Sequence, residues 1–253
     1  GDVLYTLAGF WMLFELFVFA KSPRVRYKEF LFRIGVFLGL LYVVFYSFWG
    51  LNYYRIPLKE KLQLQGDYTF KELIAVTEQL IVHANRTQLQ ITQDSQVMVV
   101  NPYTHREIFN KAIVGYDSLK RLHPNLAFQQ LSSKKSLYSL PLTYMGFGGY
   151  LNPFTNEAQV NNLVPKHNFV VTTAHEMSHQ IGIGSESEAN FVGFMATIHN
   201  DDLYFKYCGY SYALRYCLGN LENFKEGSTE ELLPLIHPGI LKNFKETQDF
   251  WDS

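Results

Sequence analysis

Two long apolar segments stand at the start of the chain. Residues 3–20 form an apolar run interrupted only by Glu15, and residues 34–54 form a second run without a charged residue. A helix of about 20 residues crosses a hydrocarbon core of ~30 Å, so both runs are predicted to be transmembrane helices. Trp49 and Tyr53, at the end of the second run, are typical of an interfacial aromatic belt. Two buried core helices are the alternative, whereas a cleaved signal peptide does not explain two successive spans.

The segment between the two runs, residues 21–33, is rich in positive charge. Four basic residues fall within eight positions: Lys21, Arg24, Arg26 and Lys28. The positive-inside rule predicts that this loop is cytoplasmic, which places residues 55–253 on the other side of the membrane. Glu15 and Arg33 lie in or beside the spans, where we expect polar helix packing or snorkelling in preference to a proton relay. Because the chain begins with Gly1 in place of Met, we also expect an upstream segment.

The remainder of the chain predicts one mostly helical α+β domain over residues 55–253, preceded by the anchor over residues 1–54. Helical periodicity or helix-like composition marks five segments: 70–84, 106–122, 169–181, 186–200 and 203–218. Short extended pieces at 97–100 and 157–163 indicate a small sheet, and Gly146, Gly148, Gly149 and Pro153 mark a loop before the second piece.

Composition removes several classes of function. The 253 residues carry 22 basic and 23 acidic side chains, a balance that argues against a nucleic-acid binder. Hydrophobic residues make up 47%, which excludes a disordered chain. The only two cysteines, Cys208 and Cys217, exclude a disulfide-rich scaffold or a CxxC…CxxC zinc cage. They lie nine residues apart in a predicted helix, about 13 Å along its axis, so we expect no disulfide between them.

The strongest chemical signal is an HExxH motif, formed by His175, Glu176 and His179, in a predicted helix. Residues four apart share a helix face, so both imidazoles are expected to reach one Zn²⁺ at about 2.0–2.1 Å. Glu176 is turned about 100° away from His175, where its carboxylate would act as general base toward zinc-bound water. The alternative is an ordinary helix whose His and Glu side chains face solvent.

A catalytic zinc site requires a third protein ligand. The run HEMSHQIGIGS matches the metzincin pattern until its last position, where Ser185 replaces histidine, so that class is excluded. Gly182 and Gly184 are expected to end the motif helix and reverse the chain, which brings the next helix back over the metal. Glu188 is then the predicted third ligand and Glu186 the reserve. The alternative role of Glu188 is a capping box with Ser185.

Three stretches carry a resemblance to a known family: AHEMSHQIGIGSESEANF, WGLNYYRIPL and GGYLNPFTNEAQVN. Together they make most of residues 49–200 resemble a family of bacterial membrane-anchored HExxH proteins, catalogued as a domain of unknown function and regarded as metallopeptidase-like. The resemblance implies a gluzincin-type, zincin-like fold with a zinc site at His175, Glu176, His179 and Glu188. It also implies a bacterial cell-envelope setting and a chain that continues beyond Ser253.

The sequence therefore predicts a zinc-dependent metallopeptidase anchored in the bacterial cytoplasmic membrane, with its catalytic domain facing the periplasm or outside. Its expected cofactor is Zn²⁺, and its expected partners are the lipid bilayer and a peptide or protein substrate. Residues 157–163 are a candidate cleft-edge strand for an extended peptide, or an ordinary structural strand. Tyr210, Tyr212, Arg215 and His237 are candidates for oxyanion stabilisation, and none is singled out. The alternative function is a catalytically inactive envelope module with a structural zinc site or a partner-binding role.

Overall fold

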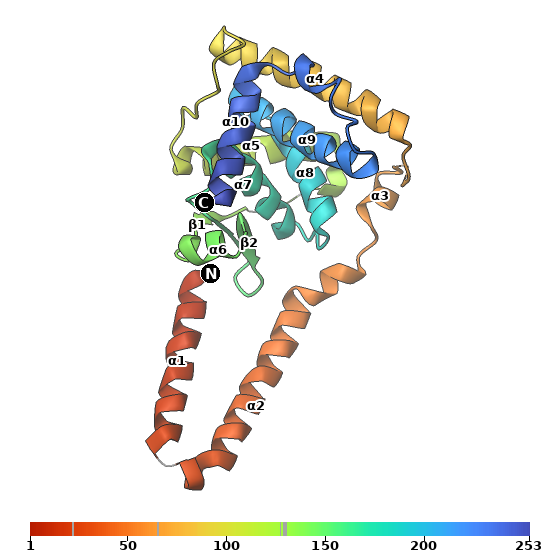
Figure 1. The fold of residues 1–253 in the computed structure, drawn as a ribbon. Coiled ribbons are helices and arrows are strands. Elements are labelled where there is room, and N and C mark those ends of the chain that lie inside the picture. Colours follow the sequence, from red (N-terminus) through yellow and green to blue (C-terminus); the bar gives the residue numbers. More distant parts are fainter. Residues whose placement is uncertain (22, 65, 127, 129–130) are drawn as a thin grey trace.

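A computed structural model describes residues 1–21, 23–64, 66–126, 128 and 131–253 of the chain. Of the predicted loop at 21–33, Ser22 lies outside the described residues, as do the side chains of residues 23–26. The structure is mostly helical with one small sheet, which confirms the predicted class (Figure 1). Its helices are α1 (Asp2–Lys21), α2 (Pro23–Phe48), η1 (Gly50–Tyr54), α3 (Leu58–Lys61), α4 (Phe70–Thr92), α5 (His105–Leu122), η2 (Pro124–Leu126), α6 (Ser139–Tyr144), α7 (Lys166–Gln180), α8 (Glu186–Ile198), α9 (Leu203–Phe224), η3 (Leu233–Leu235) and α10 (Pro238–Asp252).

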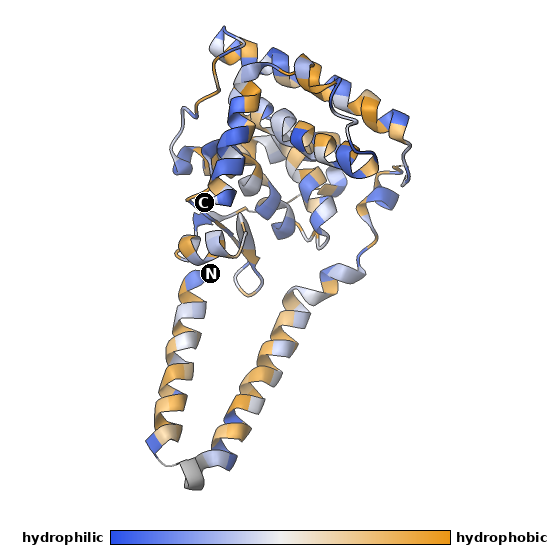
Figure 2. Cartoon of the chain, in the orientation of Figure 1, coloured by the Kyte–Doolittle hydropathy of each residue, from blue (hydrophilic) through white to orange (hydrophobic). Residues whose placement is uncertain are grey.

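The two N-terminal helices are long and apolar enough to cross a membrane. They leave the same end of the domain and meet at their far ends (Figure 1), and most of the ribbon visible in Figure 2 is coloured as hydrophobic. Almost none of their candidate spans, Asp2–Lys21 and Tyr27–Phe48, is buried inside the structure, so they are not core helices of the domain. Arg33 contacts Glu15 across the two helices at 3.1 Å, a polar helix-packing contact of the kind the sequence predicts.

Helix boundaries differ from the hydropathy pattern on either side of α2. The helix begins at Pro23, so most of the predicted 21–33 loop is helical. The apolar run continues to Tyr54, but α2 ends at Phe48 and the last five residues of the run form the 3-10 helix η1. Hydropathy reports the environment of a segment and contains no information on where its backbone turns.

The sheet has three short strands, β1 (Ser133–Lys135), β2 (Gly149–Asn152) and β3 (Glu157–Val160). Their order is β1-β3-β2, with β1 parallel and β2 antiparallel to β3. A β2–β3 turn at residues 153–156 joins the two antiparallel strands. The expected strand at 97–100 is wrong, because the amide of Asn243 on α10 bonds both backbone groups of Val99, donating to its carbonyl and accepting from its N–H.

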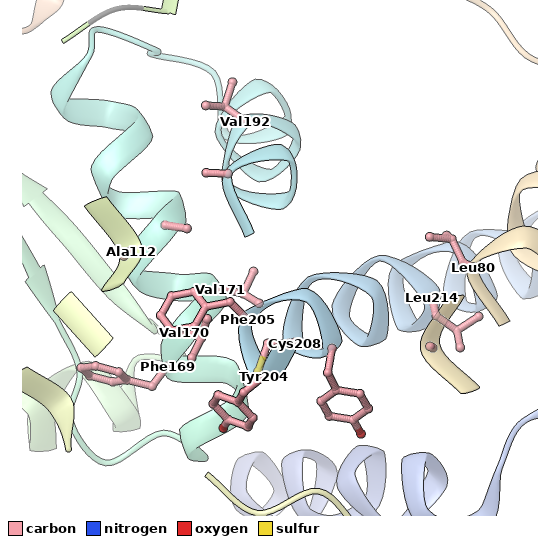
Figure 3. Close-up of a cluster of buried hydrophobic side chains, with 14 of the residues drawn as sticks. Leu80, Ala112, Phe169, Val170, Val171, Val192, Tyr204, Phe205, Cys208 and Leu214 are labelled. Atoms are coloured by element: carbon pink, nitrogen blue, oxygen red, sulfur yellow. The ribbon is translucent and has the colours of Figure 1, made fainter. Parts of the chain in front are cut away.

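The core lies between α9 and the helices α4, α7 and α8 that surround it (Figure 3). Phe169 and Val170 of α7 and Phe205 and Leu214 of α9 are fully buried there. Local signals set several helix starts: capping boxes Thr69–Glu72 and Thr104–Glu107 begin α4 and α5. Helix α9 is continuous past both cysteines, which are free thiols.

Helix α4 extends eight residues beyond its predicted end. Two of the polar residues that interrupt the apolar pattern after Ala84 are buried and bonded to backbone carbonyls: Thr87 donates to the carbonyl of His83, and Gln88 donates to those of Asp94 and Val97. Buried polar side chains that find such partners are compatible with a helix, and a hydropathy pattern does not reveal them.

Candidate metal centre

The two histidines of the motif converge on one point. Both project from the same face of α7, and their Nε2 atoms lie 3.1 Å apart. The rings stand nearly perpendicular, with an interplanar angle of 83°. For comparison, two nitrogens bound to one tetrahedral zinc at 2.0–2.1 Å are separated by about 3.3 Å. The spacing of the imidazoles therefore suits a shared metal ion.

The opposite nitrogens of the two rings show which tautomer is present. His179 Nδ1 lies 2.7 Å from the carbonyl oxygen of Ile183, and His175 Nδ1 lies 2.9 Å from Oδ1 of Asn190. A carbonyl oxygen only accepts hydrogen bonds, so each Nδ1 is the donor, and in its neutral form each ring would carry its lone pair on Nε2. Two lone pairs that face each other at this distance repel, and a bound cation removes the repulsion.

Burial keeps His175 in the neutral form. Its side chain is 14% exposed, and this burial lowers the pKa of the imidazole below its ordinary value. The neighbouring His179 lowers the pKa further, while Glu186 opposes both effects. Neutral imidazoles are the form in which histidines bind metals.

A carboxylate from the next helix completes the cluster. Glu186 is the first residue of α8, and its Oε2 and Oε1 lie 3.1 Å from Nε2 of His175 and 3.6 Å from Nε2 of His179, respectively. One ligand atom from each of the three residues lies within 4.8 Å of the others. The Glu186 side chain is 77% exposed, so this side of the cluster faces solvent. Two histidines and one carboxylate fit the ligand set of a catalytic zinc site.

The structure does not bring Glu188, the predicted third ligand, to the imidazoles. Glu186 and Glu188 are two positions apart, about 200° around the helix, so they point to opposite sides of α8. The Oε1 of Glu188 instead accepts a hydrogen bond of 2.6 Å from the backbone N–H of Leu58, which opens α3. The capping-box alternative is also wrong, because Ser185 is the N-cap residue but makes no side-chain capping bond.

The chain reversal between α7 and α8 follows the prediction. Helix α7 ends at Gln180, and Gly182 adopts a φ of +87°, a left-handed conformation that favours glycine. Its N–H bonds the carbonyl of His179 at 2.9 Å. A Cβ at this position would collide with the guanidinium of Arg55, which donates to the carbonyl of Ile181. The turn thus depends on both the backbone freedom and the small size of Gly182.

Close packing of α8 on α7 fixes the back of the site. A Cβ on Gly193 would lie 3.0 Å from the backbone nitrogen of His175, so only a residue without a side chain lets α8 approach this closely. The approach also places Asn190 against His175, and Tyr212 of α9 donates to the same Asn190 oxygen at 2.9 Å. Asn190 follows Glu186 by one helical turn, a spacing that could have identified it in the sequence.

Glu176 lies buried beside the histidines. Glu176 is 4% exposed, and its Oε2 is buried without a hydrogen-bond partner in the described part of the chain. Burial, and to a smaller extent the charge of Glu186, raises the pKa of this carboxyl well above its ordinary value. A Cβ added to Gly149, at the start of β2, would be 2.8 Å from Oε1 of Glu176. Glu176 is therefore enclosed between α7 and the sheet.

The predicted cleft-edge strand is not at the edge of the sheet. Residues Glu157–Val160 form β3, which pairs with a strand on each side. Strand β2 is one of the two edge strands of the sheet, and a Cβ on its Gly149 would contact Glu176. Pairing order depends on contacts between distant segments, so the period of apolar residues does not predict it.

The other polar candidates occupy different places. Tyr212 supports Asn190 behind His175, whereas Tyr210 stacks on His83 with ring centroids 4.8 Å apart. Arg215 donates to Gln248 on α10, and His237 contacts Gln88 on α4. Of these four residues, only Tyr212 belongs to the hydrogen-bond network of the metal cluster.

Comparison with known proteins gives one match. The family model described as "Protein of unknown function (DUF3810)" matches residues 1–253. A search of curated proteins and a search of solved structures found no match. Because the family match extends over the whole chain, this protein belongs to the DUF3810 family of proteins of unknown function.

Proposed function

We propose that this protein is a zinc-dependent peptidase with a zincin-like domain. The observation that carries the proposal is the convergence of two imidazoles and the Glu186 carboxylate beside the buried carboxyl of Glu176, whose Oε2 has no hydrogen-bond partner among the described residues. A structural zinc site requires ligands but not an additional buried acid. A catalytic site requires one, because hydrolysis of a peptide bond needs a group that takes a proton from water.

Each residue has a separate role in this proposal. His175, His179 and Glu186 hold the ion, while Asn190 and the carbonyl of Ile183 orient the two rings. When bound, zinc supplies Lewis acidity and lowers the pKa of a bound water toward about 7. Glu176 accepts the proton of the attacking water and then donates it to the leaving amine. Its raised pKa favours this second step.

Strand β2 supports a peptide as the substrate. It is an edge strand of the sheet, and Gly149 at its start lies against Glu176. An extended peptide that pairs with a free strand edge is held by main-chain hydrogen bonds over several residues. Such pairing on β2 would carry the peptide past the carboxylate of Glu176.

We further propose that α1 and α2 anchor the domain in the bacterial cytoplasmic membrane. Their length, composition and exposure support a two-span anchor. Four basic residues fall within residues 21–28: Lys21, Arg24, Arg26 and Lys28. By the positive-inside rule they remain in the cytoplasm, and the zinc site then faces the outside or periplasm.

Replacement of Glu176 by glutamine tests the catalytic role. The full chain, purified in detergent, is assayed for bound zinc and for cleavage of a mixed peptide library, with Glu78→Gln on the exposed face of α4 as control. We expect Glu176→Gln to keep its zinc and lose cleavage, while the control keeps both. Equal cleavage by wild type and Glu176→Gln would refute the general-base role. Zinc binding without cleavage in the wild type would favour a structural zinc module.

A further inference from the structure

The end of α2 lies directly on the candidate metal centre. Trp49, the first residue after α2, meets the ring of His179 edge-on, with centroids 5.7 Å apart. Six residues further on, Arg55 donates to the carbonyl of Ile181 in the turn that follows the motif helix. If α2 crosses a membrane, the metal centre therefore lies at the membrane surface and not at the distal end of the domain.

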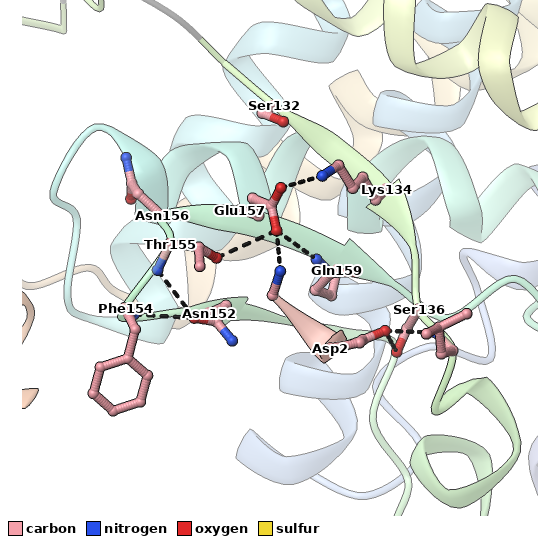
Figure 4. A network of polar contacts seen from close by, with 12 residues as sticks. Asp2, Ser132, Lys134, Ser136, Asn152, Phe154, Thr155, Asn156, Glu157 and Gln159 are labelled. Carbon is pink, nitrogen blue, oxygen red and sulfur yellow. Dashed lines mark hydrogen bonds and ion pairs between the residues drawn. The ribbon is translucent and has the colours of Figure 1, made fainter. Parts of the chain in front are cut away.

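The start of α1 is attached on the other side of the site. Asp2 accepts hydrogen bonds from the backbone N–H of Leu137 at 2.5 Å and from the hydroxyl of Ser136 at 3.1 Å (Figure 4). It also accepts a hydrogen bond from the phenol of Tyr150 on β2. Strand β2 carries Gly149, the neighbour of Glu176, so both helices join the domain beside the proposed catalytic residues.

Between these two attachment points lies an apolar groove of about 630 Å³. We call it the interhelix groove; α1 and α2 form its walls, and the β2–β3 turn closes its end toward the domain. Its lining includes Ala8, Gly9, Met12, Phe37, Leu41 and Phe154. Among the residues that line it, none is charged. In a bilayer, hydrocarbon is the chemistry that such walls bind.

The dimensions of the groove favour an acyl chain over a partner helix. Along α1 it extends from Tyr5 to Met12, a rise of about 10 Å, whereas a membrane-crossing helix is about 30 Å long. Within this stretch the rings of Trp11 and Phe37 lie with centroids 4.7 Å apart, tilted by 35°, and join the two helices. A partner helix would contact the groove over about a third of its length, whereas a flexible hydrocarbon chain can fold into the short space.

The geometry points to a lipid-modified polypeptide as the substrate. The interhelix groove binds its acyl chain, and the adjoining polypeptide passes the β2–β3 turn toward Glu176 and the metal centre. This inference rests on the proposed peptidase function, and it adds the class of substrate and the direction from which the substrate arrives. Binding of the acyl chain, however, requires only the groove and can be measured without catalysis.

The test uses full-length Glu176→Gln protein in nanodiscs of phosphatidylethanolamine and phosphatidylglycerol. The probe is a decapeptide with an N-terminal palmitoyl group that carries a photoreactive diazirine, and the cross-linked residues are mapped by mass spectrometry. We expect cross-links to α1, α2 and the β2–β3 turn. They should be competed by the palmitoylated peptide without diazirine, but not by the same peptide without its acyl chain.

Two matched variants locate the site. A Cβ on Gly9 or on Gly39 meets nothing within 4 Å, but only Gly9 lines the groove. We expect Gly9→Trp to lower the cross-linking yield because its indole fills the groove, and Gly39→Trp to leave the yield unchanged. Leu41→Trp fills the groove from its opposite wall and provides the same test if Gly9→Trp does not fold. Bound zinc reports whether each variant is folded.

Three results would overturn the inference. Equal loss in the Gly39→Trp variant would show that cross-linking does not depend on the groove. Cross-links outside the groove in the parent protein would show the same. A diazirine-labelled phospholipid that labels the groove without competition from the acylated peptide would show that the groove holds bilayer lipid only. If only the peptidase proposal fails, the acylated peptide still cross-links to the groove, but the wild type does not cleave it.

Discussion

Replacement of Glu186 and Glu188 by alanine should produce opposite phenotypes. The two residues have the same chemistry and stand two positions apart in α8, yet only Glu186 faces the imidazoles. Glu188 accepts the backbone N–H of Leu58 instead. Each variant is therefore the control for the other: Glu186→Ala should weaken zinc binding, and Glu188→Ala should destabilise the fold.

The size of each effect follows from the contacts. Zinc sites with four protein ligands bind with about 10–16 kcal/mol, or about 2.5–4 kcal/mol per ligand, so loss of Glu186 should weaken affinity about 10²- to 10³-fold. Its side chain is 77% exposed, and its removal leaves no cavity. Removal of Glu188 leaves the N–H of the buried Leu58 without its acceptor, which costs about 1–3 kcal/mol.

Zinc affinity is measured by competition with a chromogenic chelator, and stability by thermal unfolding of the zinc-free full chain in detergent. In a domain of about 200 residues, 1 kcal/mol corresponds to about 2–4 °C in Tm. If Glu188→Ala lost the zinc affinity and Glu186→Ala kept it, the assignment of the third ligand would be refuted. Loss of affinity in neither variant would show that the carboxylates do not bind the ion.

Three other predictions concern the surroundings of the site and the fold. Asn190→Ala should lower zinc affinity about 10- to 100-fold in the same competition assay, because Asn190 orients His175. Gly182→Ala should lower the free energy of unfolding by at least about 1 kcal/mol, because φ is +87° and a guanidinium occupies the Cβ position. Gly219→Ala, within α9 and in open space, should leave stability unchanged or raise it slightly in the same melt. The third prediction concerns the start of α5. There the backbone N–H of Thr104, the N-cap residue, donates to Glu107 and lowers the pKa of its carboxyl below 4.5. Glu107 therefore stabilises the fold above that pH and loses this effect as the pH falls. Glu107→Gln should therefore flatten the acid side of the stability profile, measured by thermal unfolding against pH.

Local patterns were sufficient wherever the neighbours in sequence are also the neighbours in space. The capping box at Thr104 begins α5 within one residue of the predicted start, and Gly182 ends the turn after α7 as its sequence indicates. The i, i+4 spacing of His175 and His179 predicts that their rings meet, because helix geometry alone sets that distance.

Contacts between distant segments decided the rest. The choice of Glu186 over Glu188 depends on the rotation of α8 about its axis, which the packing of Gly193 on α7 determines. The segment at 97–100 is not a strand because Asn243, more than 140 residues away, bonds its backbone. No local pattern contains either interaction.

The sequence by itself determined the two apolar helices, the paired imidazoles and the chain reversal that follows them, because each depends on residues within one or two helical turns. Only the tertiary structure decided the carboxylate that faces the imidazoles, the order of the strands and the position of the metal centre beside Trp49. These features arise from packing between segments up to about 130 residues apart, such as Trp49 on His179 of α7, and side-chain shape at the contact sets them.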